Sequence, residues 1–242
     1  MYVYIILFAG VRAMYKYFFK PFLDMLISFI GIIVLAIPML IIALAIKLDS
    51  KGPVFFKQRR VGIHKKNFTI LKFRTMRIDA PHDSPTHELS DPKKYITKVG
   101  AFLRKTSLDE LPQIFNIFAM QMSMIGPRPA LWNQDDLVAE RDKYGANDVK
   151  PGLTGWAQIN GRDELEIPVK ARLDGEYVEK MSFLFDLKCF FGTFLSVLKS
   201  DGVVEGGTGE LDRQKQNESH ADGERSSELC ETVVGGSGEN ES

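Results

Sequence analysis

The longest apolar stretch of the chain runs from Phe22 to Ile46 and contains one charged side chain, Asp24. A straight helix of this length would measure about 37 Å, enough to cross a hydrocarbon layer of roughly 30 Å. The stretch is too long for a cleavable signal peptide, and no small-residue cleavage pattern follows it. The pattern therefore predicts a membrane helix near the N-terminus.

The charges on either side of this stretch argue against a simple crossing. Basic residues precede it, and they also dominate residues 47–77, where Asp49 is the one acid. Because positively charged flanks stay in the cytoplasm, both ends are expected on the same side of the membrane. Pro38 removes a backbone hydrogen bond and would cost a straight helix about 3 kcal/mol. We therefore expect a re-entrant, monotopic helix that breaks at Ile37-Pro38, with a kinked single span as the alternative.

Beyond the apolar stretch, shorter patterns alternate between strand and helix. Residues 54–76 indicate two short strands joined by a turn at 63–67. Helices are predicted over 96–111, over 112–124 and, as a pair, over 164–198. The second helix of that pair, 183–198, is apolar on one side, which fits either a membrane surface or a protein core.

Composition and charge divide the chain into four segments. We expect an interfacial segment at 1–20, a membrane hairpin at 21–47, a globular domain at 48–203 and a disordered tail at 204–242. The chain has 31 basic and 31 acidic residues, but acidic residues outnumber basic ones by seven after residue 201. The body is therefore basic, which indicates an anionic partner such as a membrane surface, a nucleic acid or a phosphorylated substrate.

The motifs of the usual soluble nucleotide enzymes are absent from the sequence. We find no GxGxxG after a strand, no Walker A sequence, no HExxH and no GxSxG. The two cysteines, Cys189 and Cys230, have neither partners nor spacing for a zinc site or a disulfide framework.

The most concentrated polar stretch is RKTSLDELPQ, residues 104–113. If Asp109 and Glu110 lie on a helix, they point about 100° apart, so one can attack or bind a metal while the other supports it. Arg104 and Lys105, one turn earlier, would hold a phosphate and lower the pKa of Asp109. An aspartate is ionised at pH 7 and attacks phosphorus without a base. A solvated helix face with Arg–Glu pairs is the alternative.

Two further stretches have the character of binding loops. In GPRP, two prolines fix the backbone around Arg128, so its guanidinium projects from a stiff turn and suits phosphate recognition. In KPGLTGWAQINGRD, residues 150–163, Asn160 and Arg162 stand among glycines beside one tryptophan. Such a segment suits a loop that folds over a nucleotide or a sugar, and a plain tight turn is the alternative.

These stretches, in their order, resemble a known enzyme family. KPFLDMLIS, LDSKGPVFFKQRRVG, FTILKFRTM, ITKVGAFLRKTSLDELPQIFNIF, MSMIGPRP, KPGLTGWAQINGRD and SDGV span roughly residues 20–203. They are similar to the bacterial monotopic phosphoglycosyl transferases. The resemblance implies an α-dominated α/β fold, with a re-entrant helix-break-helix element followed by a small catalytic domain with amphipathic interfacial helices.

The resemblance also implies a reaction. A phospho-sugar would move from a UDP-sugar to polyprenyl phosphate and release UMP, at the cytoplasmic face of the bacterial membrane. Asp109 falls on the nucleophile of the family and Glu110 on its partner, with Mg²⁺ bound at this pair. The positions Arg104, Lys105, Arg128, Asn160 and Arg162 are then expected to bind substrate. A homodimer is also plausible from the family, whereas the sugar is left open and no nucleic acid is expected as a partner.

Two departures from the family pattern are visible. Many members have serine before the proline of the membrane helix, where this chain has Ile37, so a hydroxyl that satisfies a freed carbonyl is missing. Gln121 stands where a carboxylate is usual, which predicts an altered pocket or a slower enzyme. Two other classes compete with the transferase: a non-enzymatic membrane scaffold for glycan assembly enzymes, and a nucleic-acid-binding protein, against which the apolar stretch counts heavily.

Overall fold

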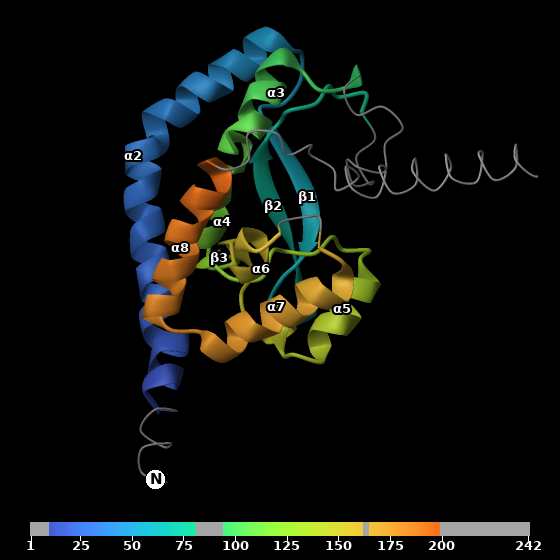
Figure 1. Cartoon of the computed structure of the whole chain (residues 1–242). Helices are drawn as coiled ribbons and strands as arrows, with labels where there is room; N and C mark the ends of the chain where they lie inside the picture. Colours follow the sequence, from blue (N-terminus) through green and yellow to red (C-terminus); the bar gives the residue numbers. More distant parts are fainter. Residues whose placement is uncertain (1–9, 81–93, 162–164, 199–242) are drawn as a thin grey trace, which may run out of the picture. The chain divides into compact units, whose positions relative to one another are not determined.

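The computed structural model describes residues 10–80, 94–161 and 165–198, and its fold is dominated by helices (Figure 1). The predicted tail, residues 204–242, lies outside the described residues. The expected α-dominated α/β class, with a long apolar N-terminal helix and a small sheet-containing domain, is confirmed.

The helices and strands follow in this order along the chain. The N-terminal half contains η1 (Tyr15–Phe19), α2 (Lys20–Asp49), β1 (Phe55–Val61), η2 (Ile63–Lys65), β2 (Asn67–Phe73), α3 (Lys98–Lys105), η5 (Leu108–Glu110) and α4 (Gln113–Phe118). The C-terminal half contains β3 (Ser123–Ile125), α5 (Asp135–Asp142), η6 (Ala146–Asp148), β4 (Gly152–Thr154), α6 (Trp156–Ile159), α7 (Ile167–Lys180) and α8 (Phe183–Leu198).

The long apolar helix is continuous. Helical structure extends over Gly10–Asp49, with η1 as a π-helical turn before α2, and Pro38 lies inside α2. Figure 1 shows the axis of α2 turning in its second half, as expected where a proline removes a helical hydrogen bond. The predicted break at Ile37-Pro38 is therefore wrong as a helix-break-helix element, because the helix bends without ending. The re-entrant arrangement in the membrane stays a prediction.

The two faces of α2 have different surroundings. Apolar side chains on its outer face are widely exposed, among them Ile37 (72%) and Leu40 (70%). Of the most apolar 18-residue segment of the helix, only 11% is buried. A core helix of a soluble protein would instead be mostly buried. The inner face packs against the globular domain, where a Cβ at Gly31 would collide with Ile114 of α4. The exposed apolar face therefore suits lipid, while the other face is in protein contact along much of its length.

A two-stranded antiparallel hairpin begins the globular domain. β1 pairs with β2 in a register that joins Phe55 to Phe73 and Val61 to Asn67, which confirms the strands and the turn predicted from the sequence. Phe73 packs with Leu103 of α3 and with Ile46 of α2. Arg74, which is buried, donates hydrogen bonds to the carbonyls of three residues just after α2: Ser50, Lys51 and Pro53. The end of α2 is thereby tied to the sheet.

The helices predicted over 96–111 and 112–124 are shorter than expected. α3 ends at Lys105, because Ser107 adopts a left-handed conformation (φ 56°) and the chain turns into the 3₁₀ turn η5. α4 stops at Phe118, and Ser123–Ile125 forms a strand that pairs in parallel with β4. The pair of helices predicted within 164–198 is confirmed as α7 and α8.

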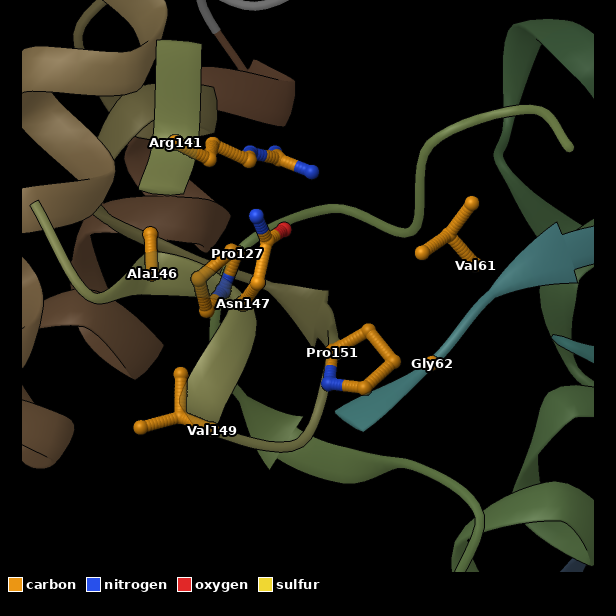
Figure 2. A pocket seen from close by; sticks show the side chains of 8 residues that line it. All are labelled: Val61, Gly62, Pro127, Arg141, Ala146, Asn147, Val149 and Pro151. Carbon is orange, nitrogen blue, oxygen red and sulfur yellow. The ribbon is translucent and has the colours of Figure 1, made fainter. Parts of the chain in front are cut away.

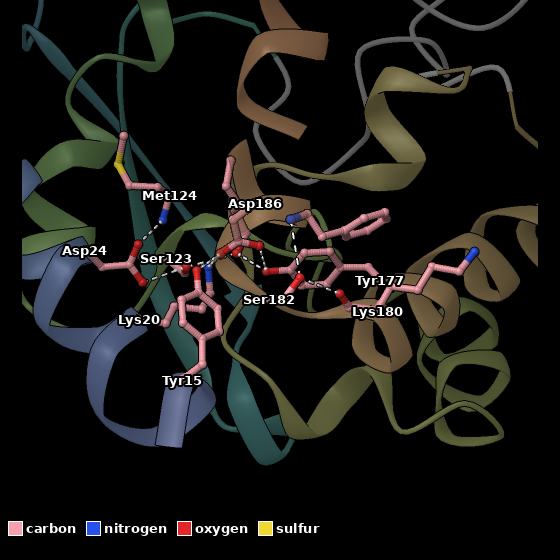
Figure 3. A network of polar contacts seen from close by, with 11 residues as sticks. Tyr15, Lys20, Asp24, Ser123, Met124, Tyr177, Lys180, Ser182 and Asp186 are labelled. Carbon is pink, nitrogen blue, oxygen red and sulfur yellow. Dashed lines mark hydrogen bonds and ion pairs between the residues drawn. The ribbon is translucent and has the colours of Figure 1, made fainter. Parts of the chain in front are cut away.

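A buried polar network connects the start of α2 to the domain (Figure 3). Asp186 of α8 accepts hydrogen bonds from Tyr15 (2.7 Å), Tyr177 (2.8 Å) and Lys20 (2.5 Å). Asp24, the one charge in the apolar stretch, accepts from Ser123 Oγ and from the backbone N–H of Met124. The charges in this helix therefore anchor it to β3 and α8, a role that the sequence pattern did not reveal.

Candidate active site

A small polar hollow lies beside η5. Its lining is rich in charged and polar side chains from five parts of the fold: Arg60 (β1), Lys72 (β2), Glu110 (η5), Gln113 (α4) and Arg128 (the turn after β3). Three cations therefore surround one carboxylate. An excess of positive charge in a concave, half-buried site favours an anionic ligand.

Glu110 lies at the centre of these charges. Its Oε1 accepts hydrogen bonds from Lys72 Nζ at 2.7 Å and from Arg128 Nη2 at 2.9 Å. Burial alone would raise the pKa of this carboxyl, but the charges of Arg128 and Lys72 outweigh it and hold the pKa well below its usual range. Glu110 is therefore ionised at neutral pH, and it fixes the positions of both cations.

The strand that carries Lys72 is held in place by Asn116 of α4. The side chain of Asn116 accepts a hydrogen bond from the backbone N–H of Leu71 and donates one to the carbonyl of Thr69. Gln121 Oε1 in turn accepts from Asn116 Nδ2 at 2.8 Å. The residue that departs from the family pattern is therefore linked through Asn116 to the strand of Lys72, and it does not line the hollow.

The turn that carries Arg128 is pinned to the third polar stretch. Gly126 donates its N–H to the carbonyl of Thr154, and the N–H of Gly152 donates to the carbonyl of Pro127. A Cβ at Gly126 would lie 2.6 Å from the carbonyl oxygen of Lys150, so this close approach requires glycine. The second and third polar stretches therefore form one rigid unit that presents Arg128 to Glu110.

The structure corrects the predicted relation between Arg104, Lys105 and Asp109. Asp109 precedes Glu110 in η5 and is half-buried. Arg104 lies on α3, before the reversal at Ser107, and its Nε donates to Thr75 Oγ1 at 2.9 Å, while Lys105 is exposed. The sequence had predicted one helix for the carboxylates and the two basic residues, but they lie on separate elements. Neither Arg104 nor Lys105 lines the hollow.

The remaining predicted binding residues lie elsewhere. Asn160 is exposed at the end of α6, and its side chain donates to the carbonyl of Trp156, which closes that short helix. It does not line the hollow. Arg162 lies outside the described residues.

Sequence reasoning missed three polar residues of the hollow: Arg60, Lys72 and Gln113. A signal for Lys72 was present, because a lysine that follows Ile70 on the same face of a strand is a charge at a buried position. Gln113 resembles any polar residue at the start of a helix, so only the tertiary fold identifies it.

The carboxylate pair fits Mg²⁺ only together with further ligands. Among the residues that the structure describes, no group of three or more His, Cys, Asp or Glu side chains could enclose a metal ion. Mg²⁺ is usually bound by one or two carboxylates, with water and substrate phosphates as the other ligands. Asp109 precedes Glu110 in η5 but is not among the residues that line the hollow, so Mg²⁺ binding by this pair stays a prediction.

A second small hollow is lined by Pro127 and by residues of β1, α5 and η6 and their flanking loops (Figure 2). Figure 2 shows Arg141 and Asn147 across from Val61 and Gly62. The charge of Arg141 is paired within the protein, because its guanidinium donates two hydrogen bonds to the buried Asp174. The Asn147 amide likewise donates to Val138 and Asp142. This hollow therefore has less capacity to bind an anion than the one beside η5.

Comparison with known proteins gives consistent matches. Residues 15–200 match the family described as bacterial sugar transferase. The uncharacterized sugar transferase EpsL of Bacillus subtilis is 44% identical over 66% of this chain and 77% of that protein. The UDP-glucose:undecaprenyl-phosphate glucose-1-phosphate transferase of Escherichia coli is 42% identical over 63% of this chain and 34% of that protein. The exopolysaccharide production protein PSS of Rhizobium leguminosarum is 39% identical over 74% of this chain and 94% of that protein.

Proposed function

The chain belongs to the bacterial sugar transferase family, and we propose that it transfers a phospho-sugar from a UDP-sugar to undecaprenyl phosphate. The observation that carries the proposal is the cationic hollow around Glu110, next to Asp109, in a domain that packs on an exposed apolar helix. Both substrates are anions and the acceptor is a lipid. Relatives named as glucose-1-phosphate transferases support UDP-glucose as the first donor to test.

The first half of the reaction is a displacement at the β-phosphorus of the donor. A carboxylate oxygen of Asp109 attacks this phosphorus, the bond from the phosphorus to the bridging oxygen breaks, and UMP leaves with the electron pair. The phospho-sugar is then bound covalently to Asp109. Because the carboxylate is ionised at neutral pH, the attack needs no general base.

The second half repeats the displacement with the lipid. A phosphate oxygen of undecaprenyl phosphate attacks the same phosphorus, and the bond to the Asp109 oxygen breaks, which restores the carboxylate and gives undecaprenyl-diphosphate sugar. Lys72 and Arg128 offset negative charge on the phosphoryl group, and Glu110 holds both cations ready. Preorganised charges of this kind need no rearrangement during the reaction.

We also propose Mg²⁺ as the cofactor, held by Asp109 and Glu110 together with the diphosphate of the donor. When bound, the ion supplies charge neutralisation at the phosphates. The side chains of the hollow bind and orient the donor on either side of the transferred phosphoryl group.

Contacts at both ends of α2 support a proposal for the membrane arrangement. Near its start, Asp24 bonds to Ser123 and Met124, and at its end Asp49 accepts a hydrogen bond from the backbone N–H of Val99. A straight crossing would separate these ends by the thickness of the bilayer, yet both contact one domain. We therefore propose that α2 enters the cytoplasmic leaflet with its exposed apolar face and returns to the same side.

Labelling from outside the cell tests this topology. Tags at residue 1 and after residue 201 are both expected to resist a membrane-impermeant reagent in intact cells, and both should react after the cells are permeabilised. A tag at residue 1 that reacts in intact cells would establish a spanning helix and contradict the re-entrant proposal.

The proposed reaction is tested by UMP release from the detergent-solubilised protein. With UDP-glucose and undecaprenyl phosphate we expect UMP release that requires both substrates, and that stops when EDTA is added and resumes with Mg²⁺. A panel of other UDP-sugars ranks the donors. If none of the panel yields UMP while the protein is folded, the proposed function is wrong.

A further inference from the structure

Gln113 contributes an unusual group to the hollow. The residue is 2% exposed and lines the hollow with Lys72, Glu110 and Arg128. Its Nε2 is buried and has no hydrogen-bond partner among the described residues. Buried side-chain amides in folded proteins nearly always have their hydrogen-bond partners, so an amide of this kind requires an explanation.

The surroundings indicate which kind of group is missing. Arg60, Lys72 and Arg128 are donors, and Glu110 Oε1 already accepts from two of them. What the hollow lacks is an acceptor for the N–H of Gln113. Because the lining has more positive than negative charges, an anionic oxygen satisfies both the amide and the excess charge.

We propose that Gln113 is a substrate-binding residue whose Nε2 donates a hydrogen bond to an oxygen of the β-phosphoryl group of the donor. The inference rests on the proposed function, since the β-phosphoryl group is the one transferred. Gln113 lies three residues after Glu110, at the first position of α4, and its amide lines the same hollow as the two cations that Glu110 holds. A neutral amide adds a directed hydrogen bond without changing the charge of the site.

Replacement of Gln113 by methionine separates this role from a structural one. Methionine has nearly the same volume and removes an unpaired buried amide, so the melting temperature is expected to stay the same or to rise. In contrast, kcat/KM for UMP release should fall about 10- to 100-fold, as expected for the loss of one hydrogen bond to a charged group. A purely structural glutamine would show the opposite pattern.

Gln134 offers a matched control. Its Oε1 accepts a hydrogen bond from the backbone N–H of Leu131 and the residue lies outside the hollow. The Gln134→Met variant is therefore expected to melt at a lower temperature than the wild type and to keep its kcat/KM. Gln113→Met is thus expected to lose activity and keep its stability, whereas Gln134→Met is expected to lose stability and keep its activity.

Binding of two nucleotides locates the contact. Affinities of UDP and UMP are measured by calorimetry for the wild type and for Gln113→Met, with Mg²⁺ present. We expect UDP to bind about 10-fold more weakly to the variant, since a hydrogen bond to a charged group is lost, and UMP, which lacks the β-phosphate, to bind both proteins equally.

Three outcomes would overturn the inference. Equal losses for UDP and UMP would contradict a contact at the β-phosphoryl group. Unchanged UDP affinity and unchanged activity in Gln113→Met, with an active wild type, would show that water or nothing meets the amide. A wild type that neither binds UDP nor releases UMP would remove both this inference and the proposed function.

Discussion

Replacing Asp109 by asparagine is expected to abolish UMP release, with a loss of about 10⁴-fold or more, as found when the nucleophile of a covalent enzyme is removed. The amide of asparagine has almost the same shape as the carboxylate but is a poor nucleophile toward phosphorus. The melting temperature should change little, because Asp109 is half-buried on a short turn. The measurement is UMP release with UDP-glucose, undecaprenyl phosphate and Mg²⁺.

A matched control is available on α5. Asp135 is an exposed aspartate in the first turn of that helix, so Asp135→Asn makes the same chemical change away from the hollow and should keep full activity. In the absence of undecaprenyl phosphate, a donor that carries its label in the sugar should transfer the label to the wild-type protein and not to Asp109→Asn. Full activity of Asp109→Asn in vitro would end the covalent mechanism, and a variant that still supports glycan assembly in cells would favour the scaffold alternative.

Replacing Asp186 by asparagine is expected to give the largest loss of stability, about 3–5 kcal/mol, because it leaves a buried cation without its counter-ion. The Lys20 and Asp186 side chains are each about 10% exposed and form an ion pair within the network of Figure 3. Tyr15 and Tyr177 donate to different oxygens of Asp186, and asparagine keeps only one acceptor oxygen, so the effect combines the lost charge with the loss of one hydrogen bond. Thermal or denaturant unfolding in detergent measures it.

An exposed ion pair and a double variant test the explanation. Asp142→Asn removes the charge that pairs with Lys65, both about half-exposed, and should lower stability far less than Asp186→Asn, because solvent screens an exposed pair. Combining Lys20→Met with Asp186→Leu removes both buried charges and should recover much of the stability lost in Asp186→Asn. A double variant that is less stable than Asp186→Asn would mean that the charges themselves are not the main cause.

The elements with a strong local pattern could be predicted from the sequence. The hairpin was indicated by two short runs around a turn, and α8 was predicted over 183–198, the bounds at which it is found. The helix 96–111 was predicted too long, because its end depends on a left-handed backbone at Ser107, a conformation that serine does not signal. The continuity of α2 through Pro38 also lay outside local reasoning, since packing against the domain supports the bent helix.

Sequence reasoning identified only some of the residues that the structure brings together in the hollow. Glu110 and Arg128 come from separate motifs and meet in one ion pair, a contact that the sequence did not predict. Arg104 was grouped with Asp109 through helical spacing, and the turn at Ser107 invalidates that spacing. Gln113 reaches the hollow through the packing of α4, a relation that no local pattern encodes, whereas strand alternation gave a signal for Lys72.

Fixing α2 to the domain at Asp24 and again at Asp49 has a consequence for how the lipid acceptor is met. If α2 lies in the cytoplasmic leaflet as proposed, the depth of its apolar face in that leaflet also sets the height of η5, which carries Asp109, above the lipid headgroups. An acceptor phosphate at the membrane surface would then reach Asp109 at a fixed height, while its long hydrocarbon chain stays in the bilayer.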